Sequence, residues 1–160
     1  MKTRRAFNLI ELMYIVLIIA ILAALSIVLI TNTQKKARDG KRFSDMNTMI
    51  AALKNYKLEN GNYPDSGGNW IIIDQSSSPN LIILSTALKP YQSSLPSDPQ
   101  RDSSYHYAYH SYPASCGLPG PFAVIAFTKV EASNNKYKEK AVCAGGAFNW
   151  DSYDYSYLLK

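Results

Sequence analysis

One carboxylate, that of Glu11, stands at the start of a long apolar stretch. It is followed by 19 residues, 12–30, that carry no charge. A charged side chain inside a bilayer costs several kcal/mol, because removing an ion from water is costly unless the ion is paired. We therefore expect Glu11 to have a cationic partner.

Two cysteines, Cys116 and Cys143, lie in the C-terminal half of the chain. In a small domain behind a membrane segment, an even pair favours a disulfide in an oxidising compartment, with two unrelated reduced thiols as the alternative. Such a bridge would close a loop of about 27 residues and contribute roughly 3–4 kcal/mol. No His or Asp stands at ligand spacing beside them, so the pair does not predict a zinc site.

The remaining polar residues predict no metal, no cofactor and no enzyme. His106 and His110 are two strand repeats apart but have no third ligand nearby, so exposed strand histidines are the simpler interpretation. Asp151 and Asp154 offer two carboxylates, whereas calcium takes six to eight oxygens. For the 12 tyrosines, strand packing is a simpler role than glycan adhesion or electron transport. The chain has no haem-attachment motif, phosphate-binding loop or nucleophile–base constellation.

Length and charge predict one modest domain plus an anchor. The chain has 160 residues and a formal net charge of +5, of which Lys2, Arg4 and Arg5 supply three. The rest carries 14 basic against 12 acidic residues, so no concentrated basic surface indicates a nucleic-acid partner.

The apolar run 12–30 would span about 28 Å as a helix, close to the thickness of a bilayer core. A cleaved secretory signal, a plain anchor and an anchor that also assembles are the three interpretations. A secretory signal has a shorter apolar core and small residues at its cleavage site, whereas Ala24 here is followed by Leu25. The pattern favours an anchor.

The helix is expected to continue to Asn60, giving about 54 residues and roughly 80 Å. Gly61 suits a left-handed cap and Pro64 prevents continuation. Apolar residues spaced by threes and fours predict one packed stripe: Ala37, Phe43, Met46, Met49, Ile50, Leu53 and Tyr56. The charged residues predict a solvated opposite face: Lys35, Lys36, Arg38, Lys41, Arg42, Asp45 and Lys54.

The C-terminal part predicts an α+β fold. A short helix is expected at 80–89 and strands at 105–109, 122–130 and 140–144, with a hairpin loop at 131–140. Three short antiparallel strands cannot bury both faces, so we expect the stripe of the long helix to cover one face of a small antiparallel β-sheet.

The segment Phe7-Asn8-Leu9-Ile10-Glu11-Leu12, after a short basic leader, resembles the N-terminus of type IV pilins and type II secretion pseudopilins. The resemblance implies that a prepilin peptidase cleaves between Ala6 and Phe7 and methylates the new amine of Phe7. It also implies that Glu11 sets the axial register of a filament by pairing with the Phe7 amine of a neighbouring subunit. The alternative is a Glu that lies at the membrane–water boundary among the lipid head groups.

The resemblance extends more loosely to the helix exit at 60–64 and the turn at 95–99. The chain departs from the family at Ala6, where Gly is usual, and at Val28, where a proline commonly kinks the anchor. Basic residues flank both ends of the anchor, so charge alone does not orient it, and a cytoplasmic leader is implied by the resemblance.

Together these features predict a pilin-like chain: a leader 1–6, a membrane and filament-core half-helix 7–30, an amphipathic half 31–60 and a globular domain 61–160. The first functional interpretation is a structural subunit of a type IV pilus-like homo-oligomeric filament. The alternatives are a pseudopilin of a type II secretion system and a membrane-tethered enzyme or receptor. The expected partners are prepilin peptidase, the assembly machinery and, before assembly, the membrane. The expected location is the inner membrane, followed by a surface or periplasmic filament.

Overall fold

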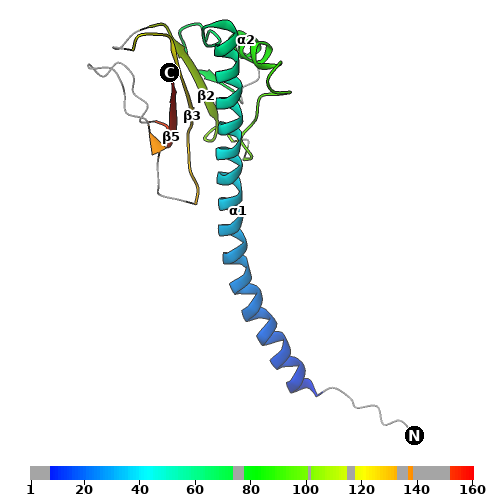
Figure 1. Ribbon diagram of the computed structural model, residues 1–160. Coiled ribbons are helices and arrows are strands. Elements are labelled where there is room, and N and C mark those ends of the chain that lie inside the picture. The colour runs from blue at the N-terminus through cyan, green and yellow to red at the C-terminus, as the bar shows by residue number, and fades with distance from the viewer. Residues whose placement is uncertain (1–7, 74–77, 101, 115–117, 133–136, 139–151) are drawn as a thin grey trace.

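The structure, a computed structural model of the 160-residue chain, describes residues 8–73, 78–100, 102–114, 118–132, 137–138 and 152–160 (Figure 1). The predicted strand at 140–144 lies outside these residues. Figure 1 shows a long helix whose first half projects away from a small domain, while its second half is flanked by a sheet and a short helix.

The long helix, α1 (Leu9–Asn60), has 52 residues and is about 78 Å long, which confirms the predicted long helix. At its start the side chain of Asn8 accepts a hydrogen bond from the N–H of Ile10 at 3.3 Å. At its end Gly61 has a φ of 77°, and its N–H donates to the carbonyl of Lys57 at 2.8 Å. Glycine adopts this left-handed conformation without steric cost, so the helix stops where the sequence predicts.

The packed stripe of α1 begins later than predicted. Met46, Met49 and Leu53 are completely buried, whereas Ala37 is exposed. The reason is geometric, because the domain flanks only the second half of the helix (Figure 1). Phe43 lies at the edge of the stripe, with its ring centroid 5.4 Å from that of Phe127.

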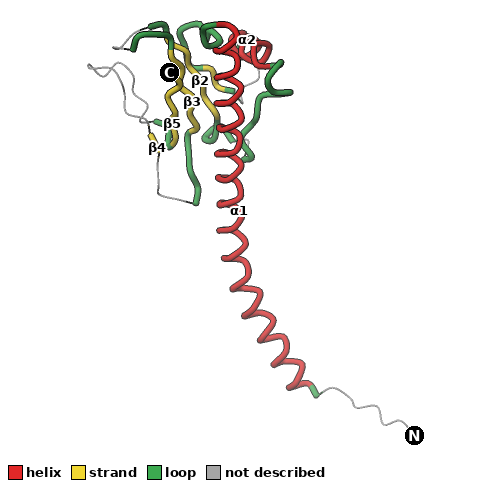
Figure 2. The backbone as a smooth tube through the Cα atoms, viewed as in Figure 1, coloured by secondary structure: helices red, strands yellow, loops and turns green. Residues whose placement is uncertain are grey.

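One sheet with five described strands packs beside this stripe (Figure 2). Its spatial order is β1–β2–β3–β5–β4, and the strands are β1 (Ile71–Ile72), β2 (Tyr107–Tyr112), β3 (Phe122–Phe127), β4 (Tyr137–Lys138) and β5 (Tyr155–Leu159). Neighbours are antiparallel except β4, which runs parallel to β5. The chain therefore has the predicted α+β architecture.

The sheet face toward α1 forms the main core. In the register of the sheet Tyr107 lies opposite Phe127, and Phe127 lies opposite Tyr155, so aromatic side chains form a row across three strands. The short helix α2 (Pro79–Leu88) adds Leu84 and Leu88, both buried, to the same cluster. This agrees with the helix predicted at 80–89.

The opposite face of the sheet is buried as well, contrary to the expectation that only one face would be covered. Val124 is completely buried, and it packs with Phe122 and Leu158 in a second cluster that Trp70 and Tyr112 border. Successive residues of the central strands are therefore buried, instead of buried and exposed residues alternating. This pattern is typical of strands covered on both faces.

Two strand predictions and one loop prediction need correction, and one strand was not predicted. The strand expected at 105–109 begins at Tyr107 and runs to Tyr112, and the strand expected at 122–130 ends at Phe127. The segment expected to be a hairpin loop contributes β4. The C-terminal strand β5 was missed, although Tyr153, Tyr155 and Tyr157 alternate with period two, as strand residues do.

Buried tyrosines form hydrogen bonds through their hydroxyl groups with distant parts of the chain. Tyr109 donates to the carbonyl of Pro64 at 2.7 Å, and Tyr63 donates to the carbonyl of Lys160 at 3.2 Å. These bonds tie the exit of α1 to the sheet and to the end of the chain. The predicted packing role of the tyrosines is confirmed for these residues.

We expect Leu53→Ala to lower the free energy of unfolding by about 2–5 kcal/mol, because it removes a fully buried side chain and leaves a cavity. Leu58→Ala is the matched control on the same helix, since Leu58 is 83% exposed. Denaturant unfolding of the detergent-solubilised chain, followed by near-ultraviolet circular dichroism, measures both. Equal midpoints for the two variants would contradict the packing described above.

Candidate functional site

The projecting half of α1 presents apolar side chains to its surroundings. From Leu9 to Leu25, and again at Ile30, these side chains are exposed, and the most apolar stretch of the helix has no buried residue. By length and composition α1 is able to cross a membrane. An exposed apolar surface of this length requires cover from lipid or from other protein chains.

Glu11 lies exposed in the first turn of α1 and is the only charged side chain from Asn8 to Ile30. With Asn8 as the N-cap, Glu11 occupies the third helical position, where the partial positive charge of the helix N-terminus favours a carboxylate. The helix itself therefore reduces the cost of this charge. A cation close to the start of α1 would reduce it further.

The other predicted site residues cannot be compared with the structure. Ala6 and Phe7, the expected cleavage pair, lie outside the described residues, as do Cys116 and Cys143. The structure therefore tests neither the cleavage nor the disulfide, and both remain predictions.

A buried ion-pair cluster lies where α1 enters the domain. The side chain of Arg42 is 0% exposed. Its Nε and Nη2 donate to the two carboxylate oxygens of Asp98 at 2.7 and 2.9 Å. Its Nη1 donates to Asp39 at 2.8 Å and to Glu131 at 2.7 Å, and the guanidinium lies 4.7 Å from the ring centroid of Tyr105.

Arg38 completes the arrangement, which we call the Arg42 cluster: Arg38, Asp39, Arg42, Asp98 and Glu131. Arg38 forms an ion pair with Glu131, with its Nε 2.8 Å from Oε1. Asp39 accepts from the backbone N–H groups of Glu131 and Ala132. The cluster thus joins α1 to the turn at 95–99 and to the segment that follows β3.

The Arg42 cluster corrects the predicted solvated face of α1. Arg42 and Asp45 were expected in solvent, and both are buried. The prediction was wrong because the partners of Arg42 lie 56 and 89 residues away in the chain, at Asp98 and Glu131. The one local signal was the spacing of Asp39 and Arg42, which places them on adjacent turns of a helix.

Mutual hydrogen bonding favours the ionised forms of Glu131 and Arg42. The pKa of Glu131 falls to about 2, chiefly because its carboxylate accepts a hydrogen bond from Arg38 and, against the opposing effect of burial, another from Arg42. Burial lowers the pKa of Arg42, but its hydrogen bonds to Asp98 and Glu131 outweigh that effect and raise the pKa overall.

His110 packs inside the domain, whereas His106 is half-buried. His110 is buried, which corrects the expectation of an exposed histidine, and burial lowers its pKa. Its Nδ1 lies 2.8 Å from the carbonyl oxygen of Ser111, and its ring stacks on that of Tyr112 at 4.0 Å. Among the described residues no group of three or more His, Cys, Asp or Glu is placed to hold a metal ion. Asp154 accepts from the N–H of Val130.

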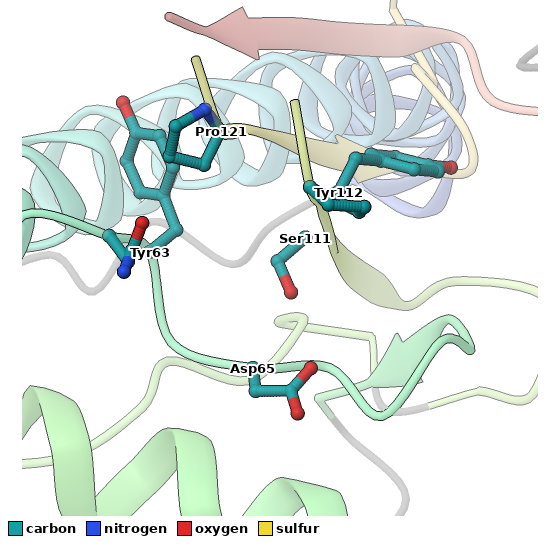
Figure 3. Close-up of a pocket in the computed structure, with 7 residues that line it drawn as sticks. Tyr63, Asp65, Ser111, Tyr112 and Pro121 are labelled. Atoms are coloured by element: carbon teal, nitrogen blue, oxygen red, sulfur yellow. The ribbon is translucent and has the colours of Figure 1, made fainter. Parts of the chain in front are cut away.

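A pocket of about 310 Å³ opens beside the exit of α1 (Figure 3). Tyr63, Tyr112 and Pro121 line it together with Asp65 and Ser111. The carboxylate of Asp65 accepts from the N–H of Gly67 at 2.9 Å, and the hydroxyl of Ser111 accepts from the N–H of Ser66 at 2.8 Å. Asp65 and Ser111 thus form hydrogen bonds with nearby backbone N–H groups rather than with each other.

Comparison with known proteins places the amino-acid sequence in a family. The family described as Type II secretion system (T2SS), protein G matches residues 29–143. The chain belongs to this family. The matched residues include the whole Arg42 cluster and do not include Glu11.

Individual relatives carry the same description. The chain is 36% identical over 64 residues to the type II secretion system core protein G of Klebsiella pneumoniae, and 38% identical over 61 residues to that of Escherichia coli strain K12. These matches cover 40% and 38% of this chain, and 46% and 42% of the two relatives, so the chain spans less than half the length of each. No solved structure matches the chain.

The family resemblance expected from the N-terminal motif is thus confirmed by residues outside that motif. On the sequence alone, a surface pilus is the first interpretation and a secretion pseudopilus the alternative. The family match favours the alternative.

We expect Arg42→Met to lower the free energy of unfolding by about 3–5 kcal/mol, because it leaves buried carboxylates without their cation. Arg42→Lys should recover only part of the loss, since an ammonium cannot bind Asp98 with two parallel hydrogen bonds. Lys54→Met, at an exposed position of α1, is the control. If denaturant midpoints for Arg42→Met and Lys54→Met agree, the cluster does not hold the domain to the helix.

The low pKa of Glu131 also predicts a pH dependence. Its folded pKa of about 2 lies below the ordinary value of 4.5, so its contribution is complete above about pH 4.5 and is lost as the pH falls toward about 2. The difference in unfolding midpoint between the unaltered chain and Glu131→Gln should therefore shrink over this interval. Asn55→Ala, which alters an exposed side chain without an ionisable group, should leave the difference from the unaltered chain constant with pH. A constant difference for Glu131→Gln would refute the assignment.

Proposed function

We propose that this chain is a pseudopilin, a structural rather than enzymatic subunit that polymerises through the apolar half of α1 into the filament of a type II secretion system. The observation that carries the proposal is the exposed apolar half-helix, with one carboxylate in its first turn, in a member of the protein G family. The similar proteins named type II secretion system core protein G support this choice over a surface pilus.

Before assembly, the projecting half of α1 lies in the cytoplasmic membrane with the leader on the cytoplasmic side. Prepilin peptidase removes residues 1–6 by cutting between Ala6 and Phe7, and the amine of Phe7 is methylated. The domain folds outside that membrane, where Cys116 and Cys143 form a disulfide. The resemblance of the N-terminal segment supports the cleavage, the methylation and the orientation of the leader, and the length of the apolar helix supports the membrane location. The even pair of cysteines in a small domain behind a membrane segment supports the disulfide.

During assembly, the apolar half of α1 exchanges lipid for the same surface of other copies. Both environments are apolar, so this exchange changes the hydrophobic free energy little, and the assembly machinery must drive it. Glu11 then pairs with the positive Phe7 amine of a neighbouring subunit. A buried pair is tolerated when both charges find partners, so this pair penalises subunits in the wrong axial position.

The test replaces Glu11 with Gln, which removes the charge and keeps the shape. We expect Glu11→Gln to be processed to a mature N-terminus at Phe7, to remain in the membrane and to enter filaments poorly. The amount of subunit in sheared filament and membrane fractions measures assembly, and mass spectrometry identifies the N-terminus.

Glu59→Gln is the control, because it removes an exposed carboxylate at the other end of the same helix and should assemble normally. Assembly of Glu11→Gln at the level of the unaltered chain would refute the register role. Recovery of the native chain as a solitary soluble species with Met1 attached would refute the whole proposal. If deletion of the gene for this chain abolishes surface filaments and leaves protein secretion intact, the chain is a subunit of a surface pilus instead.

A further inference from the structure

Lysines and carboxylates are segregated at the end of the domain that adjoins the projecting half of α1. Lys35 and Lys36 are exposed, and neither forms an ion pair with another described residue. In contrast, Asp39 and Asp98 are only 6% and 1% exposed. The surface here is therefore more positive than the sequence composition indicates.

The Arg42 cluster causes this segregation. It draws Asp39, Asp98 and Glu131 inward onto two arginines, so these three carboxylates no longer neutralise the neighbouring lysines. Lys41 is 59% exposed but pairs with the buried Asp45. The exposed Lys129 and Asp102 also lie at this end and interact with each other. The pKa of Asp102 is lowered, chiefly because its carboxylate accepts a hydrogen bond from the backbone of Ser104, and the charge of Lys129 contributes to that lowering.

The height of Lys35 and Lys36 matches the head-group layer of a bilayer. The apolar run ends at Ile30, and residues 31–34 are polar but uncharged. Five helical residues rise about 7.5 Å, which places Lys35 within the layer of roughly 5–8 Å between the hydrocarbon core and bulk water. Lys41 lies about 9 Å further along the axis, within about one Debye length of that layer at physiological salt.

We infer that Lys35 and Lys36 form a binding site for the phosphate of anionic phospholipid head groups, used while the subunit waits in the membrane. This inference rests on the proposed function, because it requires the projecting half of α1 to span the bilayer. An ammonium group in the head-group layer is attracted by the negative phosphate of an anionic lipid, and the nearby carboxylates of Asp39, Asp98 and Glu131 are already paired with arginines. Glu11, at the opposite end of the span, is too distant to do so.

Before assembly, a carboxylate on a second subunit is a poorer partner for Lys35 than a lipid phosphate. The exposed Asp102 at this end already interacts with Lys129 of its own chain. Glu59 is 24 residues beyond Lys35 on the same helix, about 36 Å along the axis. Parallel subunits in one membrane hold Glu59 and Lys35 at these different heights, whereas lipid phosphates lie at the height of Lys35. Head-group binding therefore also fixes how deeply the subunit sits, and its loss becomes part of the work of extraction.

The test uses the full-length chain reconstituted in phosphatidylcholine vesicles that contain a trace of spin-labelled lipid. The fraction of motionally restricted label, measured by electron paramagnetic resonance, reports which lipid contacts the protein. We expect spin-labelled phosphatidylglycerol to be preferred several-fold over spin-labelled phosphatidylcholine, and the preference to fall with added salt. In Lys35→Gln/Lys36→Gln the preference should fall to near parity.

Lys54→Gln/Lys89→Gln is the matched control, since it removes two exposed lysines far from the span and should keep the preference. Glycerol phosphate added to the water should not abolish the preference, and if it does, a soluble phosphate ester is the ligand instead. Equal contact with both lipids in the unaltered chain, or an unchanged preference in Lys35→Gln/Lys36→Gln, would overturn the inference. So would cross-linking of Lys35 to a carboxylate of a second copy in these vesicles.

Retention after alkaline carbonate extraction separates the two proposals. A chain that carbonate releases from cell membranes does not span them, and the proposed function then fails as well. A chain that is retained but shows no lipid preference overturns only the head-group site.

Discussion

The apolar half of α1 has no cover from any described part of its own chain, and this constraint governs the rest of the molecule. From Leu9 to Leu25 its side chains are exposed around the whole circumference of the helix. Hydrophobic attraction is strong but non-directional, so lipid and a bundle of like helices satisfy this surface about equally well. In the proposed function, the few charged groups near the two ends of this segment therefore decide in which environment, and at what axial position, the helix rests.

The Arg42 cluster transmits that axial position to the domain. Burying ions costs desolvation, so such a cluster adds little stability over an apolar core of the same volume. Its value lies in geometry, because one planar guanidinium binds α1, the turn at Asp98 and the segment at Glu131 in fixed directions. The domain is thus held in one orientation on a helix whose side chains are exposed from Leu9 to Leu25. The proposed filament, a regular array of subunits, requires that fixed orientation.

The parts of this structure that local chemistry dictates were predictable from sequence. The periodicity of Met46, Met49 and Leu53, with Gly61 as a stop, predicts α1 and its packed face. The Arg42 cluster and β5 were not predicted, because both depend on long-range pairing. Nothing near Arg42 in the chain identifies Asp98 or Glu131 as its partners. Since charged residues are normally exposed, the solvated face was the reasonable expectation, and tertiary contacts overrode it.

Charge and apolar surface therefore have separate tasks along this helix. A uniformly apolar helix can slide along its neighbours at little cost in free energy. Its burial therefore holds the helices together but does not fix their axial position. Glu11 at the start of the span and Lys35 just beyond it are each favourable only at one height, the former opposite a cation and the latter opposite a phosphate. In the proposed function, the lysine end positions the membrane state and the glutamate end positions the filament state. Extraction would then exchange one positional charge contact for the other while the apolar contacts are replaced in kind, so the transfer would be sensitive to a few ionic groups despite the large apolar area involved.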